Sequence, residues 1–396
     1  MNDARPPRAL IVGGSLGGLF AATALRTIGW DVQVFERSIS ALDSRGGGIV
    51  LQPDVLAAFR FARIERTKAL GVRSGDRIYL DASDNVIDRA LMPQTQTSWN
   101  MLHGSLSRAL PPTLVHRGET LVGFDQQENC VHAHFASGRI ERGDLLVGAD
   151  GPRSTVRELL LPDALPRYAG YVAWRGLAPE HLVSDRAKAK LEGTFSFQQG
   201  KDFLLLAYLV PGEDESTVPG HRRWNWVWYR RLDEEADFDE VMTDAHGRRR
   251  QFSIPPGALA ARPAQALREA ASRLLAPSFV DLIDATREPF VQAILDLDIS
   301  RMVFDRVVLV GDAAFIARPH TAGSTAKAAA NAVALAEALA SSPNIDVSLG
   351  DWGRQQVQVG LDMTARGRAM GDRIMGIFHG ARRHQTTATT RTDGLP

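Results

Sequence analysis

Six residues near the N-terminus, Gly13-Gly-Ser-Leu-Gly-Gly18, have the types and spacing of a phosphate-binding turn. A dinucleotide fingerprint has glycine at its first, third and sixth positions, and here Ser15 stands at the third. The backbone of such a turn approaches a pyrophosphate at a helix N-terminus, where free amides and the positive end of the helix dipole attract the anion. Serine is small enough to preserve most of this approach, so the segment predicts a dinucleotide site.

Glu36 lies 18 residues after Gly18, close to the offset of ~20 residues at which an acidic side chain binds ribose hydroxyls. The intervening pattern predicts a βαβ unit, with strands at 9–12 and 32–35 and a helix at 19–28. The alternative is a glycine-rich turn with a merely solvated Glu36. The unit by itself does not distinguish NAD from FAD.

Two later segments each place a turn directly after an apolar strand. Residues 144–149 lead into Asp150-Gly-Pro-Arg-Ser-Thr-Val-Arg157, and a strand predicted over 303–310 leads into Gly311-Asp-Ala-Ala-Phe-Ile-Ala-Arg-Pro319. Open α/β sheets bind ligands at the carboxyl ends of their strands. Following the fingerprint in this order, the two segments resemble the DG and GD motifs of the FAD-dependent aromatic hydroxylases, the group A flavoprotein monooxygenases.

Three further segments, 168–176, 225–229 and 318–320, are similar to members of that family that hydroxylate pyridine rings. The resemblance implies FAD as cofactor and NADH or NADPH as co-substrate. It also implies that Asp150 contacts the FAD pyrophosphate region and that Asp312 binds the ribityl side.

The chain departs from the family pattern at two places. The family has an arginine where His103 stands, and it has Gly-Gln-Gly-x-Asn where this chain has Gly323-Ser-Thr-Ala-Lys327, so backbone amides near Ala322 would serve instead. The segment 44–49 resembles the family's loop for a mobile isoalloxazine ring, with a tight turn and a solvent-facing Arg45 as the alternative. The residues expected to contact FAD are Gly13, Gly14, Ser15, Leu16, Gly18, Glu36, Arg37, Arg45, Gly47, His103, Leu121, Asp150, Gly311, Asp312, Pro319, Ala322 and Gly323.

The resemblance implies that NAD(P)H reduces FAD, that O2 then forms a C4a-hydroperoxyflavin, and that oxygen is transferred to an electron-rich ring carbon. The protein must position the ring, exclude water and help to deprotonate a ring hydroxyl. His320 is the first candidate base, because an unperturbed pKa of ~6.5 suits proton exchange. Tyr208 and Arg175 are candidates for hydrogen bonds to a hydroxylated heterocycle or its anion. A structural role is the alternative for His320.

Aromatic-rich alternating stretches between about 165 and 300 predict an antiparallel sheet. Side chains alternate along a strand, so Trp224, Trp226 and Trp228 would share one face, with Asn225 and Tyr229 on the other. We expect the tryptophans to pack the sheet against helices, ligand contact being the alternative.

The predicted fold is therefore α/β: a Rossmann-like FAD-binding domain with an interleaved antiparallel-sheet substrate domain and a C-terminal helix. The expected boundaries are 1–165 with 290–345 for the FAD-binding domain, 166–289 for the substrate domain, 346–378 for the helix and 379–396 for a disordered tail.

The amino-acid composition narrows the classes of binding partner that we expect. Lys plus Arg and Asp plus Glu both number 46, which gives no net field for nucleic acid or an anionic membrane. The one cysteine, Cys130, allows neither an intrachain disulfide nor a thiolate metal cluster, and the ten histidines form no zinc motif, so no metal site is expected. We expect a cytoplasmic enzyme without a membrane-spanning segment, and the family suggests a homodimer.

Two alternatives stay open from the sequence. One is a flavoprotein of the same fold with another chemistry: a salicylate-type or urate-type hydroxylase, an epoxidase or a ring-opening oxygenase. The other is a non-enzymatic flavin-binding regulator, which stimulation of nicotinamide oxidation by a small aromatic compound would exclude.

Overall fold

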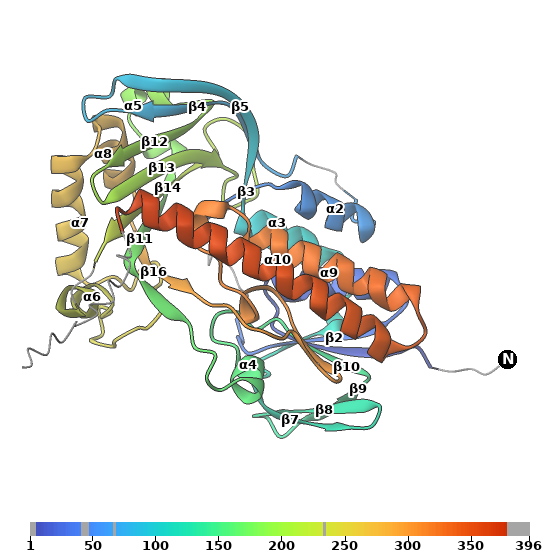
Figure 1. The fold of residues 1–396 in the computed structure, drawn as a ribbon. Coiled ribbons are helices and arrows are strands. Elements are labelled where there is room, and N and C mark those ends of the chain that lie inside the picture. Colours follow the sequence, from blue (N-terminus) through green and yellow to red (C-terminus); the bar gives the residue numbers. More distant parts are fainter. Residues whose placement is uncertain (1–4, 41–46, 66–68, 233–234, 378–396) are drawn as a thin grey trace, which may run out of the picture.

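The computed structural model describes residues 5–40, 47–65, 69–232 and 235–377 (Figure 1). One sheet contains the predicted βαβ unit, since β1 pairs in parallel with both β2 and β10. The strands of this six-stranded sheet, in spatial order, are β17 (Val303–Phe304), β18 (Val307–Leu309), β10 (Leu145–Gly148), β1 (Arg8–Val12), β2 (Asp31–Glu36) and β6 (Val115–Arg117).

The prediction of a single strand over 303–310 is wrong. Residues 303–309 form a hairpin in which β17 and β18 pair antiparallel, and only β18 continues the parallel part of the sheet beside β10. Asp305 between the two strands has φ +50°, the left-handed conformation that Asp tolerates better than most residues and that two-residue hairpin turns require. The end of β18 still delivers Gly311 to the carboxyl edge of the sheet, as expected.

A second, nine-stranded sheet is mostly antiparallel and contains the aromatic-rich strands. Residues 48–98, which precede the predicted substrate domain, also supply three of its strands. In spatial order these strands are β15 (Ser253–Ile254), β16 (Phe290–Asp296), β11 (Arg167–Pro179), β14 (Arg223–Arg231), β13 (Phe203–Val210), β12 (Thr194–Gly200), β4 (Val72–Leu80), β5 (Val86–Ser98) and β3 (Gly48–Val50). A small third sheet consists of β7 (Leu121–Gln127), β8 (Cys130–Phe135) and β9 (Ile140–Gly143).

Helices cover both sheets. The long helices α9 and α10 run side by side, and α10 continues past α9 to the large sheet, at whose far side α7 and α8 lie (Figure 1). The α-helices are α1 (Leu16–Thr27), α2 (Pro53–Phe61), α3 (Trp99–Arg108), α4 (Thr155–Leu160), α5 (Asp185–Leu191), α6 (Glu235–Val241), α7 (Ala261–Leu274), α8 (Pro277–Asp284), α9 (Ser324–Ser341) and α10 (Ile345–Ile374). Short 3₁₀ turns are η1 (Pro112–Leu114), η2 (Glu180–Leu182), η3 (Gly311–Ala313) and η4 (Pro319–Thr321).

The two faces of the nine-stranded sheet bury different side chains. Trp224, Trp226 and Trp228 belong to a core shared with buried residues of α7 and α8, and Trp226 Nε1 donates to Thr286 Oγ1 at 2.8 Å. This confirms that the tryptophans pack the sheet against helices. The opposite face carries a separate cluster of tyrosines and phenylalanines that includes Tyr208.

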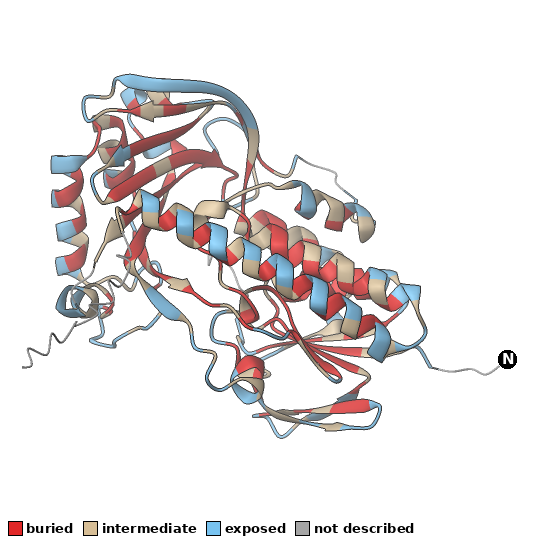
Figure 2. Cartoon of the chain, in the orientation of Figure 1, coloured by how far each residue is buried: buried red, intermediate tan, exposed pale blue. Residues whose placement is uncertain are grey.

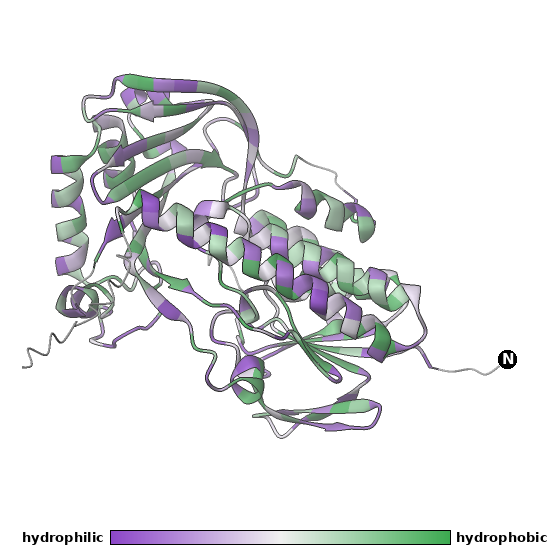
Figure 3. Cartoon of the chain, viewed as in Figure 1, coloured by the Kyte–Doolittle hydropathy of each residue, from purple (hydrophilic) through white to green (hydrophobic). Residues whose placement is uncertain are grey.

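The burial and hydropathy patterns agree with this layering. The central strands β1, β10 and β18 of the six-stranded sheet are buried and mostly apolar, while α7 and α10 alternate between buried and exposed residues (Figures 2 and 3). Within the described ranges, no helix is both long and apolar enough to cross a membrane. The predicted domain boundaries stay a prediction, and the tail 379–396 lies outside the described residues.

Candidate cofactor and substrate site

The glycine turn between β1 and α1 leaves no room for side chains at its two ends. Gly13 has φ +113°, and a Cβ there would lie 2.4 Å from the Ala149 carbonyl oxygen. A Cβ at Gly18 would lie 1.8 Å from the Gly13 carbonyl oxygen. Both contacts are to backbone, so glycine is required at the first and last positions for the chain to close into this turn. Ser15 is the N-cap residue of α1, and Leu16 is its first residue.

Glu36 lies where the sequence predicts it, at the end of β2 next to the turn. Its Oε2 accepts a hydrogen bond from the Gly14 amide at 2.8 Å, and its Oε1 accepts one from the Ser38 amide at 2.8 Å. His103 Nε2 is 3.2 Å from the Gly14 carbonyl oxygen, and its ring stacks on Trp99. The structure therefore brings together Gly14, Glu36 and His103, three residues predicted for the cofactor site.

The DG segment and the GD segment are joined by one buried arginine. Arg157 donates through Nη1 to the Ala313 carbonyl at 3.1 Å and through Nη2 to the Pro152 carbonyl at 2.7 Å. The carboxylate of Asp150 accepts from Ser154 Oγ at 2.5 Å and from the Val156 amide at 3.3 Å. Asp150 thus stabilises the start of α4, and burial raises its pKa despite these hydrogen bonds.

Asp312 follows Gly311, which has φ +61° and forms the turn at the end of β18. Desolvation raises the pKa of Asp312, and the positive charge of Lys327 opposes that rise. Further along the GD segment, the Ala322 amide donates to the Pro319 carbonyl at 2.9 Å and the Gly323 amide donates to Thr321 Oγ1 at 3.2 Å. These two amides are engaged within the turn, and α9 begins directly after them.

Other residues predicted for the cofactor site have different surroundings. Arg37 is exposed just after β2, and Leu121 is buried in the core at the start of β7. Arg45 lies outside the described residues. Gly47 is described: a Cβ there would lie 2.9 Å from Asn225 Oδ1 and 3.0 Å from Arg175 Nη2. The segment that begins at Gly47 therefore contacts the large sheet directly.

Arg175 and Tyr208 lie on the tyrosine-bearing face of that sheet, opposite Gly47 and Gly48. The Gly48 amide donates to Asn225 Oδ1 at 2.7 Å, and a Cβ at Gly48 would lie 2.5 Å from Tyr208 Cε2. Arg175 donates through Nη1 to Gln292 Oε1 at 2.8 Å. Burial raises the pKa of Tyr208, so its phenol stays protonated.

His320 lies against the same face, within an aromatic cluster. Its Nε2 is hydrogen-bonded to the Tyr171 hydroxyl at 2.8 Å, and its ring lies 4.4 Å from the Tyr229 ring, centroid to centroid. Burial and the charge of Arg318 lower the pKa of His320 to about 4. The pKa of ~6.5 expected from the sequence therefore does not apply, because the imidazole is desolvated beside a cation.

Sequence reasoning did not single out several polar residues around this site. Strand alternation had placed Asn225 on the face away from the tryptophans, which was the available signal for it. Arg318 and Lys327 lie in segments that the resemblance already used, but no local signal gives them a role, and none marks Gln292, because their roles depend on distant partners. Arg318, for example, forms ion pairs at 2.7 Å with Asp296 of β16 and with Asp372 of α10.

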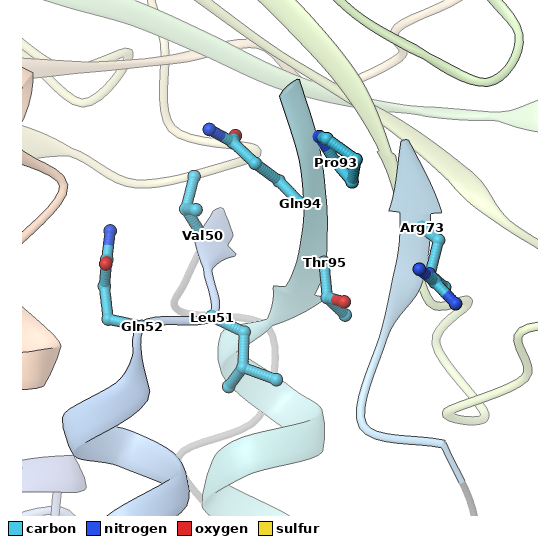
Figure 4. Close-up of a pocket in the computed structure, with 7 residues that line it drawn as sticks. All are labelled: Val50, Leu51, Gln52, Arg73, Pro93, Gln94 and Thr95. Atoms are coloured by element: carbon cyan, nitrogen blue, oxygen red, sulfur yellow. The ribbon is translucent and has the colours of Figure 1, made fainter. Parts of the chain in front are cut away.

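A pocket of about 490 Å³ opens beside β3, at the point where the chain turns into α2 (Figure 4). Val50, Gln52 and Gln94 extend toward the upper part of the view and Leu51 and Thr95 toward the lower part, and all five line the pocket (Figure 4). Val50 also packs against the tyrosine-bearing cluster. The pocket thus adjoins the candidate site, although none of the predicted site residues lines it.

The residues present fit an FAD molecule. Without side chains at Gly13 and Gly18 the fingerprint turn closes at the N-terminus of α1, where an anion would bind, and Glu36 presents carboxylate oxygens beside it as ribose acceptors. Asp312 supplies a further carboxylate at the carboxyl edge of the same sheet. These positions match the sites at which a dinucleotide presents its pyrophosphate and its hydroxyl groups.

Comparisons with known proteins agree with this arrangement. Residues 168–296 match a family described as FAD binding domain-like. The chain is 34% identical over 368 residues to 2,6-dihydroxypyridine 3-monooxygenase of Paenarthrobacter nicotinovorans, covering 93% of this chain and 91% of that protein. It is 26% identical to 6-hydroxynicotinate 3-monooxygenase of Bordetella bronchiseptica, covering 83% and 82%.

Solved structures show the same fold. The structure of 2,6-dihydroxypyridine-3-hydroxylase from Arthrobacter nicotinovorans superimposes with a TM-score of 0.87 at 33% identity, covering 94% of this chain and 93% of that one. A Klebsiella pneumoniae protein complexed with FAD and uric acid gives a TM-score of 0.75 at 23% identity, covering 94% and 89%, and shows the fold alone. With a relative of this identity and coverage, and with a dinucleotide cradle in place, the chain belongs to the FAD-dependent aromatic hydroxylases, the group A flavoprotein monooxygenases.

Proposed function

We propose that this protein hydroxylates a hydroxylated pyridine or a similar electron-rich aromatic ring, with NADH or NADPH and O2 as co-substrates. The observation that carries the proposal is a pair of buried, unpartnered donors on the tyrosine-bearing face. Arg175 Nε and Asn225 Nδ2 have no hydrogen-bond partner among the residues that the structure describes. A buried donor without an acceptor costs about 1–3 kcal/mol, so the site is built to receive an acceptor from a ligand.

Oxygen substituents of a hydroxypyridine supply such acceptors. In its anionic or lactam form the ring presents oxygen atoms with lone pairs, which suit a guanidinium and a carboxamide donor. Two named relatives act on hydroxylated pyridine compounds, which supports the same substrate class. Tyr208, paired with Asn225 across the two strands, would add a third contact to the ring through its hydroxyl group.

FAD, when bound, supplies the redox and oxygen-transfer chemistry. The chain's own residues would bind and orient the ring through Arg175 and Asn225, and exclude water with the surrounding aromatic side chains. His320 is neutral at pH 7, and its Nε2 is hydrogen-bonded to the Tyr171 hydroxyl, so it would orient that hydroxyl and, through it, a ring hydroxyl of the substrate. Its low pKa makes full proton removal by His320 alone inefficient.

The test is anaerobic bleaching of the oxidised flavin absorption by NADH or NADPH, with hydroxypyridines, hydroxybenzoates, salicylate and urate as effectors. We expect a hydroxypyridine to accelerate bleaching and to yield a hydroxylated product when air is admitted. Acceleration by none of the pyridines would refute the substrate class, and stimulation by salicylate or urate alone would favour that branch of the family.

A pair of variants on one strand sharpens the test. Arg175→Met removes the unpartnered donor and should abolish the stimulation while FAD stays bound. Arg167→Met, at the exposed start of β11, should leave the stimulation unchanged. The homodimer and the cytoplasmic location stay predictions.

A further inference from the structure

Lys327 is buried at a place where two physical effects, desolvation and the positive end of a helix, oppose a cation. It is 2% exposed, it lies in the first turn of α9, and burial lowers its pKa to about 8. The first turn of a helix is the positive end of the dipole, which disfavours a second positive charge. A buried ammonium group persists there only if specific partners compensate for its desolvation.

The partners are the atoms of the GD turn. Lys327 Nζ donates to the Gly311 carbonyl at 2.7 Å. One helical turn later on the same face of α9, Asn331 Oδ1 accepts from the Gly311 amide at 3.3 Å. Both backbone groups of Gly311 are thus held by α9 side chains, and Gly311 has the left-handed conformation that leads the chain into Asp312.

Asn331, the second α9 residue that binds Gly311, is itself hydrogen-bonded to α10. Asn331 Nδ2 donates to Gln356 Oε1 at 2.7 Å, and Trp352 Nε1 donates to the Asn331 carbonyl at 3.2 Å. Asn331 and Gln356 are both buried. The α9 residues that bind the turn are therefore held in place by α10. For this reason we do not expect α9 to move and compensate for a substitution at Lys327.

Among the described residues, few charged groups lie near Lys327. Asp312 of η3 is the charged group that acts on it, and Lys327 in turn opposes the raised pKa of Asp312. Arg157 of α4 approaches the same turn at the Ala313 carbonyl. The buried residues of α1 and α2, which also pack against α9, are uncharged, as are the two α10 residues behind Asn331.

We propose that Lys327 is a positioning residue of the FAD site. Its ammonium group fixes the Gly311 turn and keeps the neighbouring Asp312 carboxylate ionised, so that this carboxylate accepts hydrogen bonds from the hydroxyl groups of bound FAD. If Lys327 only filled space, an uncharged residue of similar size would bind FAD equally well.

The test measures FAD release from the holoenzyme by flavin fluorescence on serial dilution, for the wild type and Lys327→Met, from about pH 6 to about pH 9.5. At pH 7 we expect the dissociation constant of Lys327→Met to be roughly tenfold or more above that of the wild type, as loss of a charge-assisted hydrogen bond predicts. The wild type should weaken as Lys327 loses its proton at high pH, so the two proteins should converge there.

Controls separate this role from simple packing. Arg222→Met removes another buried cation, which pairs with Glu180 of η2 and contacts neither the fingerprint turn nor the GD segment in any described hydrogen bond, and it should lower stability without weakening FAD binding. Should Lys327→Met fail to fold, Lys327→Gln, which keeps a donor but no charge, carries the same comparison. A difference of less than about twofold at pH 7, or a gap that does not change with pH, would overturn the proposal.

Discussion

Replacing Gly18 by alanine should abolish tight FAD binding, because the added methyl group has nowhere to go. Its Cβ would lie 1.8 Å from the Gly13 carbonyl oxygen, whereas ordinary contacts begin at about 3.4 Å, so turn and helix must separate by roughly 1.6 Å. The turn is held from the other side, since the Gly13 amide donates to the Phe35 carbonyl at 2.8 Å and a Cβ at Gly13 would meet the Ala149 carbonyl oxygen at 2.4 Å. We expect the start of α1 to move away from the strand.

Such a shift breaks the contacts on which anion binding depends. A hydrogen bond of ordinary length is lost when its atoms separate by more than about 1 Å. Hydrogen bonds to a charged group contribute about 1.5–3 kcal/mol each, so losing two amide contacts to the pyrophosphate costs about 3–6 kcal/mol. The corresponding loss of FAD affinity is at least ~100-fold.

Gly17→Ala is the matched control. At Gly17 an added Cβ would meet only the Ala328 methyl group, at 3.9 Å, and alanine favours the helix over glycine by about 0.5–1 kcal/mol. The assay compares the flavin-to-protein absorbance ratio of the purified proteins, followed by fluorescence on dilution. Retention of FAD by Gly18→Ala at the wild-type level would contradict the predicted clash. So would a loss of FAD from Gly17→Ala as large as the loss from Gly18→Ala.

Three further outcomes follow from buried groups. His320 is neutral above its pKa of about 4, so the pH profile of substrate-stimulated flavin reduction should show no inflection near 6.5 that depends on His320. An inflection near 6.5 in the wild type that disappears in His320→Gln would contradict the desolvated site. Arg318→Met removes the partner of the buried Asp296 carboxylate and should lower the free energy of unfolding by about 3–5 kcal/mol in urea titrations, a loss that a surface arginine would not produce. Trp226→Phe should cost about 1–2 kcal/mol through the lost bond to Thr286 but leave the flavin spectrum unchanged, since the residue faces the helices; a spectral shift would argue against that placement.

The cofactor half of the site could be predicted from the sequence because its geometry is local. Gly13, Gly18 and Glu36 lie within a single βαβ unit, where turn closure and strand pairing follow from neighbouring residues. The DG and GD segments were placed correctly at strand ends, even though the strand before Gly311 is a short hairpin. The hairpin was missed because Asp305 and Arg306 interrupt the apolar run only briefly, and one turn of this kind gives a weak local signal.

The substrate half depended on distant contacts. The Gly48 amide and Asn225 are 177 positions apart in the chain, and Tyr171 and His320 are 149 apart, yet each pair is hydrogen-bonded. The alternation of β14 indicated the face on which Asn225 lies, but not that its Nδ2 is buried without a partner. Such facts arise only when separate strands are brought together.

The sequence by itself determined the family, the dinucleotide turn and the two-faced aromatic sheet, because short-range sterics and side-chain alternation are fixed by residue order. Only the tertiary structure decided the protonation of His320 and the placement of Lys327 beneath Gly311. Desolvation and through-space charge depend on what the rest of the chain packs around a side chain, and Arg318 lowers the pKa of His320 in this protein because both are buried together.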